Sequence, residues 1–484
     1  MKNNQIVAKN DNKLARRLTF NDMFFTGVAY MIGVGIFALM PYIIKYGQKN
    51  SVLAFIIGGI LCTMTGLSFA RLNYQYPVND AEYSWIREIL KKKDEKEPSK
   101  GVNAFATLTI WVVGLLGVFS MAFISIGLVD YIQTYNLGIP KRLIIIFSLA
   151  IPTIINMVGV KSVANFAKVV IYVIISVMVV LIGASGFKGD KKFMKQNSLV
   201  PNISNSFNLV RASFLTVQTL TGFQSVVQLS EEAKKKDTIP KSITASVVFT
   251  TILYALLVFS VISIIGLSAA SKTVYPVSLA YNKIFGTKGR DVVSILCIIT
   301  MYSALIILIL GVSRLFHKLA EKKIAPNYLS KLVSIDELFK KKKKENFEND
   351  EKETVQSNNV LDKLGGEAVQ GISGYNNKAV KKSKFDKMPI PALLTLFVIA
   401  FFLTFIKGGL LEVIANFTNT MLAFIFTVVN FLVIVNYFKF KKVEIKTESK
   451  MINTLFKMFP WYAIIGVIVS LVFLIMSPKF YDIL

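Results

Sequence analysis

Long, uninterrupted apolar runs restrict the folds that this chain can adopt more than any other feature. Runs of 18 or more apolar residues recur along its 484 residues, and each can cross the roughly 30 Å hydrocarbon core of a bilayer. The mean hydropathy is +0.54, which excludes an ordinary soluble domain. Strands of a membrane β-barrel would instead alternate apolar and polar residues over about ten positions. The sequence therefore predicts an all-α polytopic membrane protein.

The apolar runs form eleven predicted spans, giving about 11–12 transmembrane helices. They cover residues 20–46, 51–76, 101–135, 141–158, 163–187, 207–233, 241–267, 288–320, 389–407, 410–438 and 456–477. The predicted organisation is an N-terminal arm (1–19), a first set of five spans (20–187), a second set (188–438) with a polar insert (327–387), and a C-terminal part (439–484) holding a loop and one more span.

Lysine and arginine set the predicted orientation. They gather in the N-terminal arm and in the connections after spans two, six and ten, and short cytoplasmic loops carry this excess. The N-terminus is therefore predicted to be cytoplasmic, in a multi-pass membrane protein. The net charge of +27 arises from these loops, so we expect a lipid bilayer and a small molecule as partners and no nucleic acid. No sequence feature defines the oligomeric state.

Residues for catalysis or metal binding are scarce. The chain has one histidine, and its two cysteines, Cys62 and Cys297, both lie in apolar spans. A zinc site or a disulfide framework would need clustered ligands or paired cysteines. We therefore predict no metal, no cofactor and no enzymatic activity.

Two spans contain residues that disfavour a regular membrane helix. The first span reads "VAYMIGVGIF" with Gly33 and Gly35, and the sixth reads "TVQTLTGFQSVVQ" with Gly222. Interrupted helices at matching positions of two halves indicate a transporter's midplane binding site. Freed backbone groups find no partner in lipid, but they can bind the carboxylate and ammonium of a small zwitterion. Close helix packing is the alternative, and we prefer it for Gly58, Gly59, Gly114 and Gly117.

Several motifs carry a family resemblance over residues 18–440. "MIGVGIF" resembles the Gly-x-Gly signature in the first helix of the amino acid–polyamine–organocation (APC) permeases. "GFQSVVQLSEEAKKKDTIPKSI" is similar to that family's sixth helix and the loop after it. "NMVGVKS", "SRLFHKLAEKKIAP" and "MPIPALL" resemble, in order, the turn between helices four and five, the end of helix eight and the start of helix nine.

The resemblance implies a five-plus-five inverted-repeat fold with broken helices 1 and 6, which moves amino acids across the plasma membrane by alternating access. The substrate carboxylate would meet the amides of Val34 and Gly35, and the ammonium would meet carbonyls near Tyr30 and Met31. The full predicted substrate-binding set is Tyr30, Met31, Gly33, Val34, Gly35, Gln218, Thr219, Leu220, Thr221, Gly222, Gln224 and Tyr302.

The resemblance identifies the gate residues and the coupling ion less specifically than the substrate-binding residues. Phe223 and Glu231 are the candidate gate residues, because the family's aromatic gate positions match Gln218 and Leu220, which are not aromatic. Gln224 replaces an acidic residue found in many members. Candidate residues for Na⁺ or H⁺ coupling are Thr300, Ser303 and Asp130, whereas exchange or facilitated uptake, which we favour, needs no carrier residue.

Other functions stay open at this point. A transporter of polyamines or other amines with the same fold, a non-transporting amino acid sensor and a channel would all account for broken helices. We identify no acid near the predicted site, and this disfavours a dedicated cationic substrate, because a buried cation needs a counter-charge.

Overall fold

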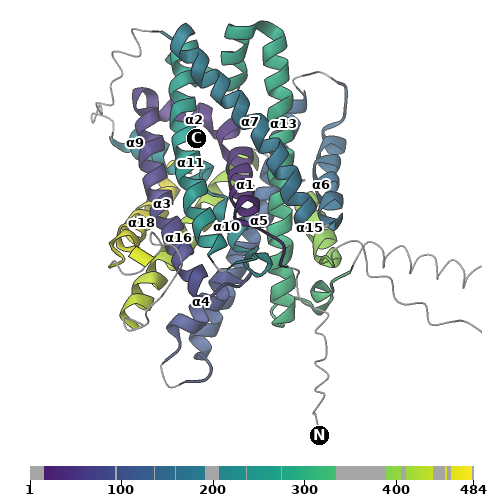
Figure 1. The fold of residues 1–484 in the computed structure, drawn as a ribbon, viewed down its shortest axis with the longest axis vertical. Helices are drawn as coiled ribbons and strands as arrows, with labels where there is room; N and C mark the ends of the chain where they lie inside the picture. The colour runs from purple at the N-terminus through teal and green to yellow at the C-terminus, as the bar shows by residue number, and fades with distance from the viewer. Residues whose placement is uncertain are drawn as a thin grey trace, which may run out of the picture.

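The computed structural model (Figure 1) describes residues 16–92, 95–133, 135, 137–158, 160–190, 206–235, 237–273, 275–333, 387–404, 410–439, 453–454 and 459–481. Most of the predicted N-terminal arm and of the polar insert lies outside these residues. Within them, the regular structure is helical, and β-pairing is limited to two isolated bridges, Leu18 with Ala233 and Val333 with Met388. The prediction of an all-α fold is confirmed for this part of the chain.

Helices pack side by side into one bundle (Figure 1). The first half contains α1 (Phe20–Met31), η1 (Ile32–Ile36), α2 (Phe37–Gly47), η2 (Gln48–Asn50), α3 (Ser51–Gln75), α4 (Ala81–Leu90), α5 (Lys100–Gln133), α6 (Lys141–Val158) and α7 (Val160–Lys188). The second half contains α9 (Ser206–Thr219), α10 (Phe223–Val227), η4 (Ser230–Glu232), α11 (Thr238–Ile265), α12 (Leu267–Lys272), α13 (Pro276–Glu321), η5 (Asn327–Ser330), α15 (Ile390–Leu403), α16 (Leu410–Lys439) and α18 (Trp461–Tyr481).

Each predicted span overlaps one of these helices, except that the first covers α1, η1 and α2 and the sixth covers α9, α10 and η4. Six stretches are long and apolar enough by themselves to cross a membrane: Leu39–Gln75, Lys100–Gln133, Lys168–Lys188, Thr238–Ile265, Pro276–Glu321 and Phe417–Lys439. Shorter apolar helices cover Ile390–Leu403 and Trp461–Met476. The fold is that of a polytopic membrane protein.

The outer surface of the bundle is apolar, as contact with lipid requires. Phe187 is 90% exposed, Ile475 68% and Val169 64%. Water would penalise so much exposed hydrocarbon, whereas lipid tails solvate it without cost. The polar residues of the bundle accordingly lie inside it or at its ends.

The N-terminus of α1 is fixed by a capping box and an ion pair. Thr19 N–H donates to Asp22 Oδ2 at 2.8 Å, and Asp22 N–H donates to Thr19 Oγ1 at 3.4 Å. The other Asp22 oxygen lies 2.5 Å from Lys168 Nζ on α7. Since a carboxylate also suits the positive end of the helix dipole, these contacts anchor α1 to α7.

The two unusual spans depart from regular α-helix in different ways. In the first, Ile32–Ile36 form a π-helical segment between α1 and α2, so this span widens but does not unwind as we expected. π-helical turns of this kind are frequent at functional sites. In the sixth, α9 ends at Thr219 and α10 begins at Phe223, so the helix is interrupted over residues 220–222.

Glycines bring these two spans into direct backbone contact. A Cβ atom at Gly35 would lie 2.3 Å from Thr219 Cα, before the interruption. A Cβ atom at Gly222, after it, would lie 2.8 Å from Met31 Cγ and 3.0 Å from Met31 N. Both approaches need the absence of a side chain. Gly33 likewise lies against α13, where a Cβ would meet Thr300 O at 2.5 Å.

The other four glycines pack helices as predicted. A Cβ at Gly58 would lie 2.8 Å from Thr216 Cβ, and one at Gly59 would lie 2.0 Å from Thr251 Cγ2. Gly114 and Gly117 have similarly close neighbours on α13, Phe316 at 3.1 Å and Val312 at 2.4 Å.

We expect Gly35→Ala to lower the apparent melting temperature of the protein in detergent and to impair its activity. The new methyl group would press on the backbone of α9, which cannot rotate away, and overpacking of this kind costs about 1–3 kcal/mol. Gly183→Ala on α7 is the matched control, because a Cβ there meets nothing within 4 Å. Equal melting temperatures for the two variants would contradict the tight packing at Gly35.

Candidate functional site

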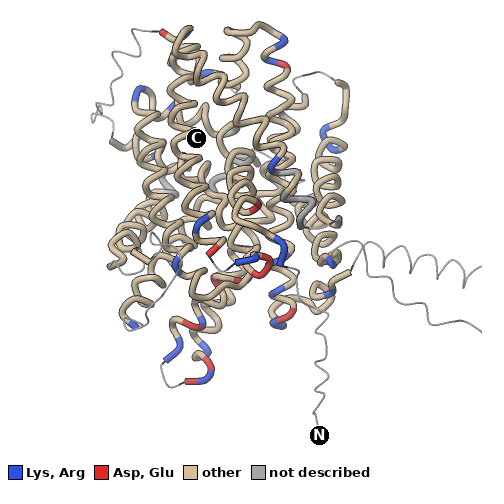
Figure 2. The backbone as a smooth tube through the Cα atoms, in the orientation of Figure 1, with Lys and Arg blue, Asp and Glu red and all other residues tan. Residues whose placement is uncertain are grey.

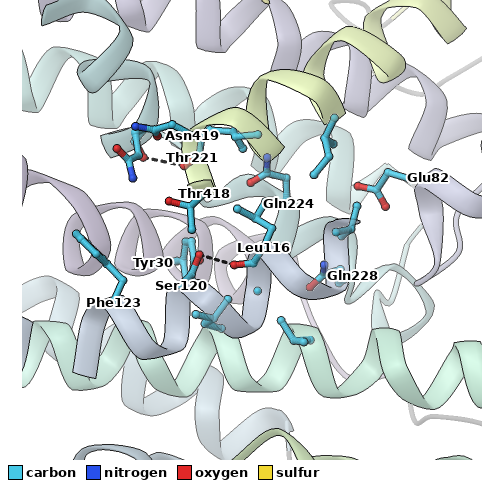
Figure 3. A pocket seen from close by; sticks show the side chains of 17 residues that line it. Tyr30, Glu82, Leu116, Ser120, Phe123, Thr221, Gln224, Gln228, Thr418 and Asn419 are labelled. Atoms are coloured by element: carbon cyan, nitrogen blue, oxygen red, sulfur yellow. Dashed lines mark hydrogen bonds between the residues drawn. The ribbon is translucent and has the colours of Figure 1, made fainter. Parts of the chain in front are cut away.

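A cavity of ≈ 60 Å³ lies beside the contact between the first and sixth spans. Seven helices and the interruption between α9 and α10 contribute to its wall, and Figure 3 shows their side chains around a common space. The lining residues are Tyr30, Glu82, Val113, Leu116, Gly117, Ser120, Phe123, Gln218, Thr221, Gln224, Gln228, Leu308, Val312, Thr418, Asn419, Leu422 and Ile425.

Four residues of the predicted substrate-binding set line this cavity. Tyr30 comes from α1, Gln218 from the last turn of α9, Thr221 from the interruption itself and Gln224 from α10. The interruption places them together, because it turns the chain between α9 and α10 so that residues before and after it face the same space. Their role as substrate ligands stays a prediction.

The other members of the set lie next to the cavity or away from it. Met31, Gly33, Gly35, Thr219 and Gly222 form the contacts of the first span with the sixth span and with α13. The carbonyl of Leu220 accepts from Cys62 Sγ at 3.4 Å. Val34 belongs to η1, and its side chain lies outside the described residues. Tyr302 is half-buried on α13 and does not line the cavity.

The candidate gate residues have firm partners. Phe223 is fully buried, with its ring centroid 5.2 Å from that of Phe69 and 6.0 Å from that of Phe426. It therefore belongs to an aromatic cluster behind the cavity wall. Glu231 forms an ion pair of 3.1 Å with Lys318 near the end of α13.

The candidate ion-coupling residues differ in their surroundings. Thr300 Oγ1 donates to the Leu296 carbonyl of its own helix at 2.6 Å, as hydroxyls in membrane helices commonly do. Ser303 Oγ is buried without a hydrogen-bond partner. The Asp130 side chain lies outside the described residues. Among the residues that the structure does describe, no group of three or more His, Cys, Asp or Glu could hold a metal ion.

Polar atoms without partners distinguish the cavity wall. Gln218 Oε1, Gln228 Oε1, Asn419 Oδ1 and Glu82 Oε2 are buried acceptors, and Gln224 Nε2 is a buried donor, with no hydrogen-bond partner for any of them among the described residues. Buried polar groups are normally paired, because leaving one unpaired costs about 1–3 kcal/mol. A polar ligand or water in the cavity would satisfy them.

Glu82 corrects our expectation that no acid lies near the site. It lies in the first turn of α4, in the polar connection between spans two and three, and it lines the cavity at 1% exposure. Figure 3 shows its carboxyl group on the same side of the cavity as Gln228. Burial, reinforced by the nearby Asp80 carboxylate, raises the pKa of Glu82 to about 7. The acid weakens our argument against a cationic substrate.

Three ion pairs lie at the end of the bundle that carries α4 and the C-terminal turn of α13, which we call the α4 end. Arg314 Nε lies 2.6 Å from Glu232 Oε1, and both side chains are buried. Lys318 pairs with Glu231, and Lys322 pairs with Asp80. Figure 2 shows acidic and basic residues gathered around this end. The three pairs connect α13 to α4 and to the segment that follows α10.

The apolar helices, the interrupted span and the cavity together define a polytopic membrane protein with polar side chains around a small cavity between its helices. The comparisons with known proteins give the family. The amino acid permease family matches the chain over residues 18–482. The chain belongs to this family, within the APC superfamily that the sequence motifs indicated.

The chain is similar to several characterised permeases of Bacillus subtilis. It is 21% identical over 345 residues to the branched-chain amino acid permease BcaP, covering 66% of this chain and 70% of that protein. It is 22% identical over 335 residues to the serine/threonine exchanger SteT, covering 68% and 74%. It is 23% identical over 342 residues to the methylthioribose transporter, covering 66% and 70%.

We expect Glu82→Gln to remove a pH dependence of stability. Because the pKa of Glu82 is raised to about 7 in the folded protein, this group stabilises the fold fully below the pKa of the unfolded chain, and that contribution is lost as the pH rises through 7. The loss is at most about 3 kcal/mol. Melting temperatures of wild type and variant should agree at about pH 4, diverge as the pH rises toward 7 and stay apart above it, with the variant the more stable. A difference independent of pH would contradict the raised pKa.

We expect Glu232→Ala to destabilise the protein strongly. It leaves the Arg314 guanidinium buried without its carboxylate, and breaking a buried pair in this way costs about 3–5 kcal/mol. Glu321→Ala is the control, since Glu321 is an exposed residue about two turns beyond Arg314 on α13. Equal melting temperatures for these variants would mean that Arg314 finds another partner.

Proposed function

We propose that this protein is a secondary transporter that moves amino acids across the plasma membrane by alternating access. The observation that carries the proposal is the cavity beside the interrupted sixth span, whose wall has unpaired hydrogen-bond acceptors and an unpaired donor. An amino acid offers both an ammonium to the acceptors and a carboxylate to the donor. Family membership and the similarity to BcaP and SteT support this substrate class.

The proposed mechanism uses a five-plus-five inverted repeat. Two five-span sets enter the membrane from opposite sides, and the first span of each set, α1–η1–α2 and α9–α10, is irregular. The α4 end, which we assign to the cytoplasm from the lysines and arginines of its loops, is closed by the three ion pairs. Opening would separate α13 from α4 and from the segment after α10, and Glu231 would act in this gate.

The substrate would bind next to Tyr30, Gln218, Thr221 and Gln224. In the conformation described here, Thr219 occupies the space next to Gly35, so the amides of Val34 and Gly35 would receive a carboxylate only after α9 moves away from η1. Ser303 Oγ, buried and unpaired, is the strongest remaining candidate for a Na⁺ ligand in α13.

The test is uptake of a pooled mixture of labelled amino acids by purified full-length protein in liposomes, either empty or preloaded with unlabelled amino acids. We expect saturable uptake into preloaded vesicles. Gln218→Leu, which removes a cavity acceptor, should raise the half-saturation concentration about tenfold, the equivalent of one lost hydrogen bond. Gln133→Leu, at the end of α5 and outside the cavity, should behave as wild type.

Each other outcome points to a named alternative. Uptake that does not saturate would indicate a channel, and saturable binding without uptake would indicate a sensor. If amino acids are neither bound nor moved by folded protein, the proposal fails. Labelled polyamines and methylthioribose are then the next probes, the second because a methylthioribose transporter is among the similar proteins.

A further inference from the structure

One buried carboxyl group in the described part of the chain lacks the partner that the others have. The buried acids there are Asp22, Asp80, Glu82 and Glu232. Asp22 pairs with Lys168, Asp80 with Lys322 and Glu232 with Arg314. Glu82 forms no ion pair, and its Oε2 atom has no hydrogen-bond partner although it is enclosed by protein.

The helices around Glu82 either have no charged residue nearby or have charged residues that contact other groups. Between Lys100 at its first residue and Asp130 near its end, α5 has no charged residue. On α16, Lys439 Nζ donates to the carbonyl of Ile89 at 3.0 Å, and on α3 the guanidinium of Arg71 lies 5.7 Å from the Tyr437 ring centroid.

The charged residues close to Glu82 in sequence, and those that contact α4, also have other partners. Lys322 binds Asp80 and donates to Ser84 Oγ at 2.7 Å, and Arg87 pairs with Glu97 at 2.6 Å. From the segment after α10, Glu231 is held by Lys318. The charged group acting most directly on Glu82 is therefore the like-charged Asp80.

We infer that Glu82 is a proton-binding site that couples the closing of the α4 end to proton movement. The inference rests on the proposed transport function. A carboxylate with no cation, buried beside another carboxylate, is costly, whereas the neutral acid is tolerated and can donate to an amide oxygen of the cavity wall. Closing of the α4 end therefore favours protonated Glu82, and opening to water removes the penalty on the charged form.

The proton balance of one transport cycle follows directly. One proton from the solution on one side of the membrane binds the Glu82 carboxylate, giving the neutral acid while the α4 end is closed. When that end opens to the opposite solution, the acid releases the same proton and returns to the carboxylate. No other group needs to change its protonation state. One proton then crosses the membrane with each substrate.

The test measures accumulation of the pooled labelled amino acids in liposomes that contain the full-length protein, with the membrane potential clamped and the outer solution one pH unit more acidic than the inner. One proton per substrate gives about tenfold accumulation for that gradient. We expect this from wild type. Glu82→Gln, which mimics the neutral acid, should exchange label with preloaded vesicles and show no accumulation.

Glu88→Gln is the matched control, with the same substitution in the same helix at a residue whose side chain is 49% exposed. It should accumulate label as wild type does. Accumulation by Glu82→Gln at the wild-type level would overturn the inference. So would exchange by wild type without accumulation in a gradient of either direction, and in that case the transport function would stand.

A second measurement does not depend on transport. The infrared spectrum of the wild-type protein should contain a protonated-carboxyl band that disappears as the pH rises through neutrality, and Glu82→Gln should lack that band. Its absence from wild type would overturn the inference even if Glu82→Gln failed to fold. Failure of wild type to exchange or accumulate amino acids at all would instead refute the proposed function.

Discussion

The close approach of the first and sixth spans is the constraint on which the rest of the structure depends. Thr219 and Gly222 lie on either side of the interruption, and they contact Gly35 and Met31 respectively. An interrupted helix frees backbone groups that lipid cannot satisfy, so it is tolerated only where protein or a polar cavity covers it. The bundle supplies both, with the glycine contacts on one side and the cavity on the other.

The α4 end shows how differently the same kind of group behaves in different surroundings. Asp80 and Glu82 are two residues apart, and both are buried. Asp80 has Lys322 beside it, whereas Glu82 lines the cavity together with several amide side chains. Burial without a cation raises the pKa of Glu82 to about 7. Asp80 thus has a structural role and Glu82 a titrating one, although they are only two residues apart.

The sequence predicted the helical class, the positions of the spans and the irregular stretches around Gly33, Gly35 and Gly222, because these depend on local composition. It did not predict that the first span stays helical as a π segment, since that depends on how its amides find new partners. Nor did it identify Glu82, because only the folding of α4 back against α5 brings a residue from a polar connection to the cavity. Gln228, just after α10, and Asn419, on α16, were missed as well, because an isolated amide side chain has no distinctive local pattern.

The π-helical segment η1 also allows α2 to rotate relative to α1. Each residue of a regular α-helix turns the chain by about 100°, and a π-helical turn holds an additional residue without leaving the helix. If η1 returned to α-helical geometry, α2 would turn about its axis relative to α1, and the backbone amides would exchange carbonyl partners along the way. The first span can thus allow α2 to rotate relative to α1. During this rotation every peptide group keeps a hydrogen-bond partner, and none is exposed to lipid.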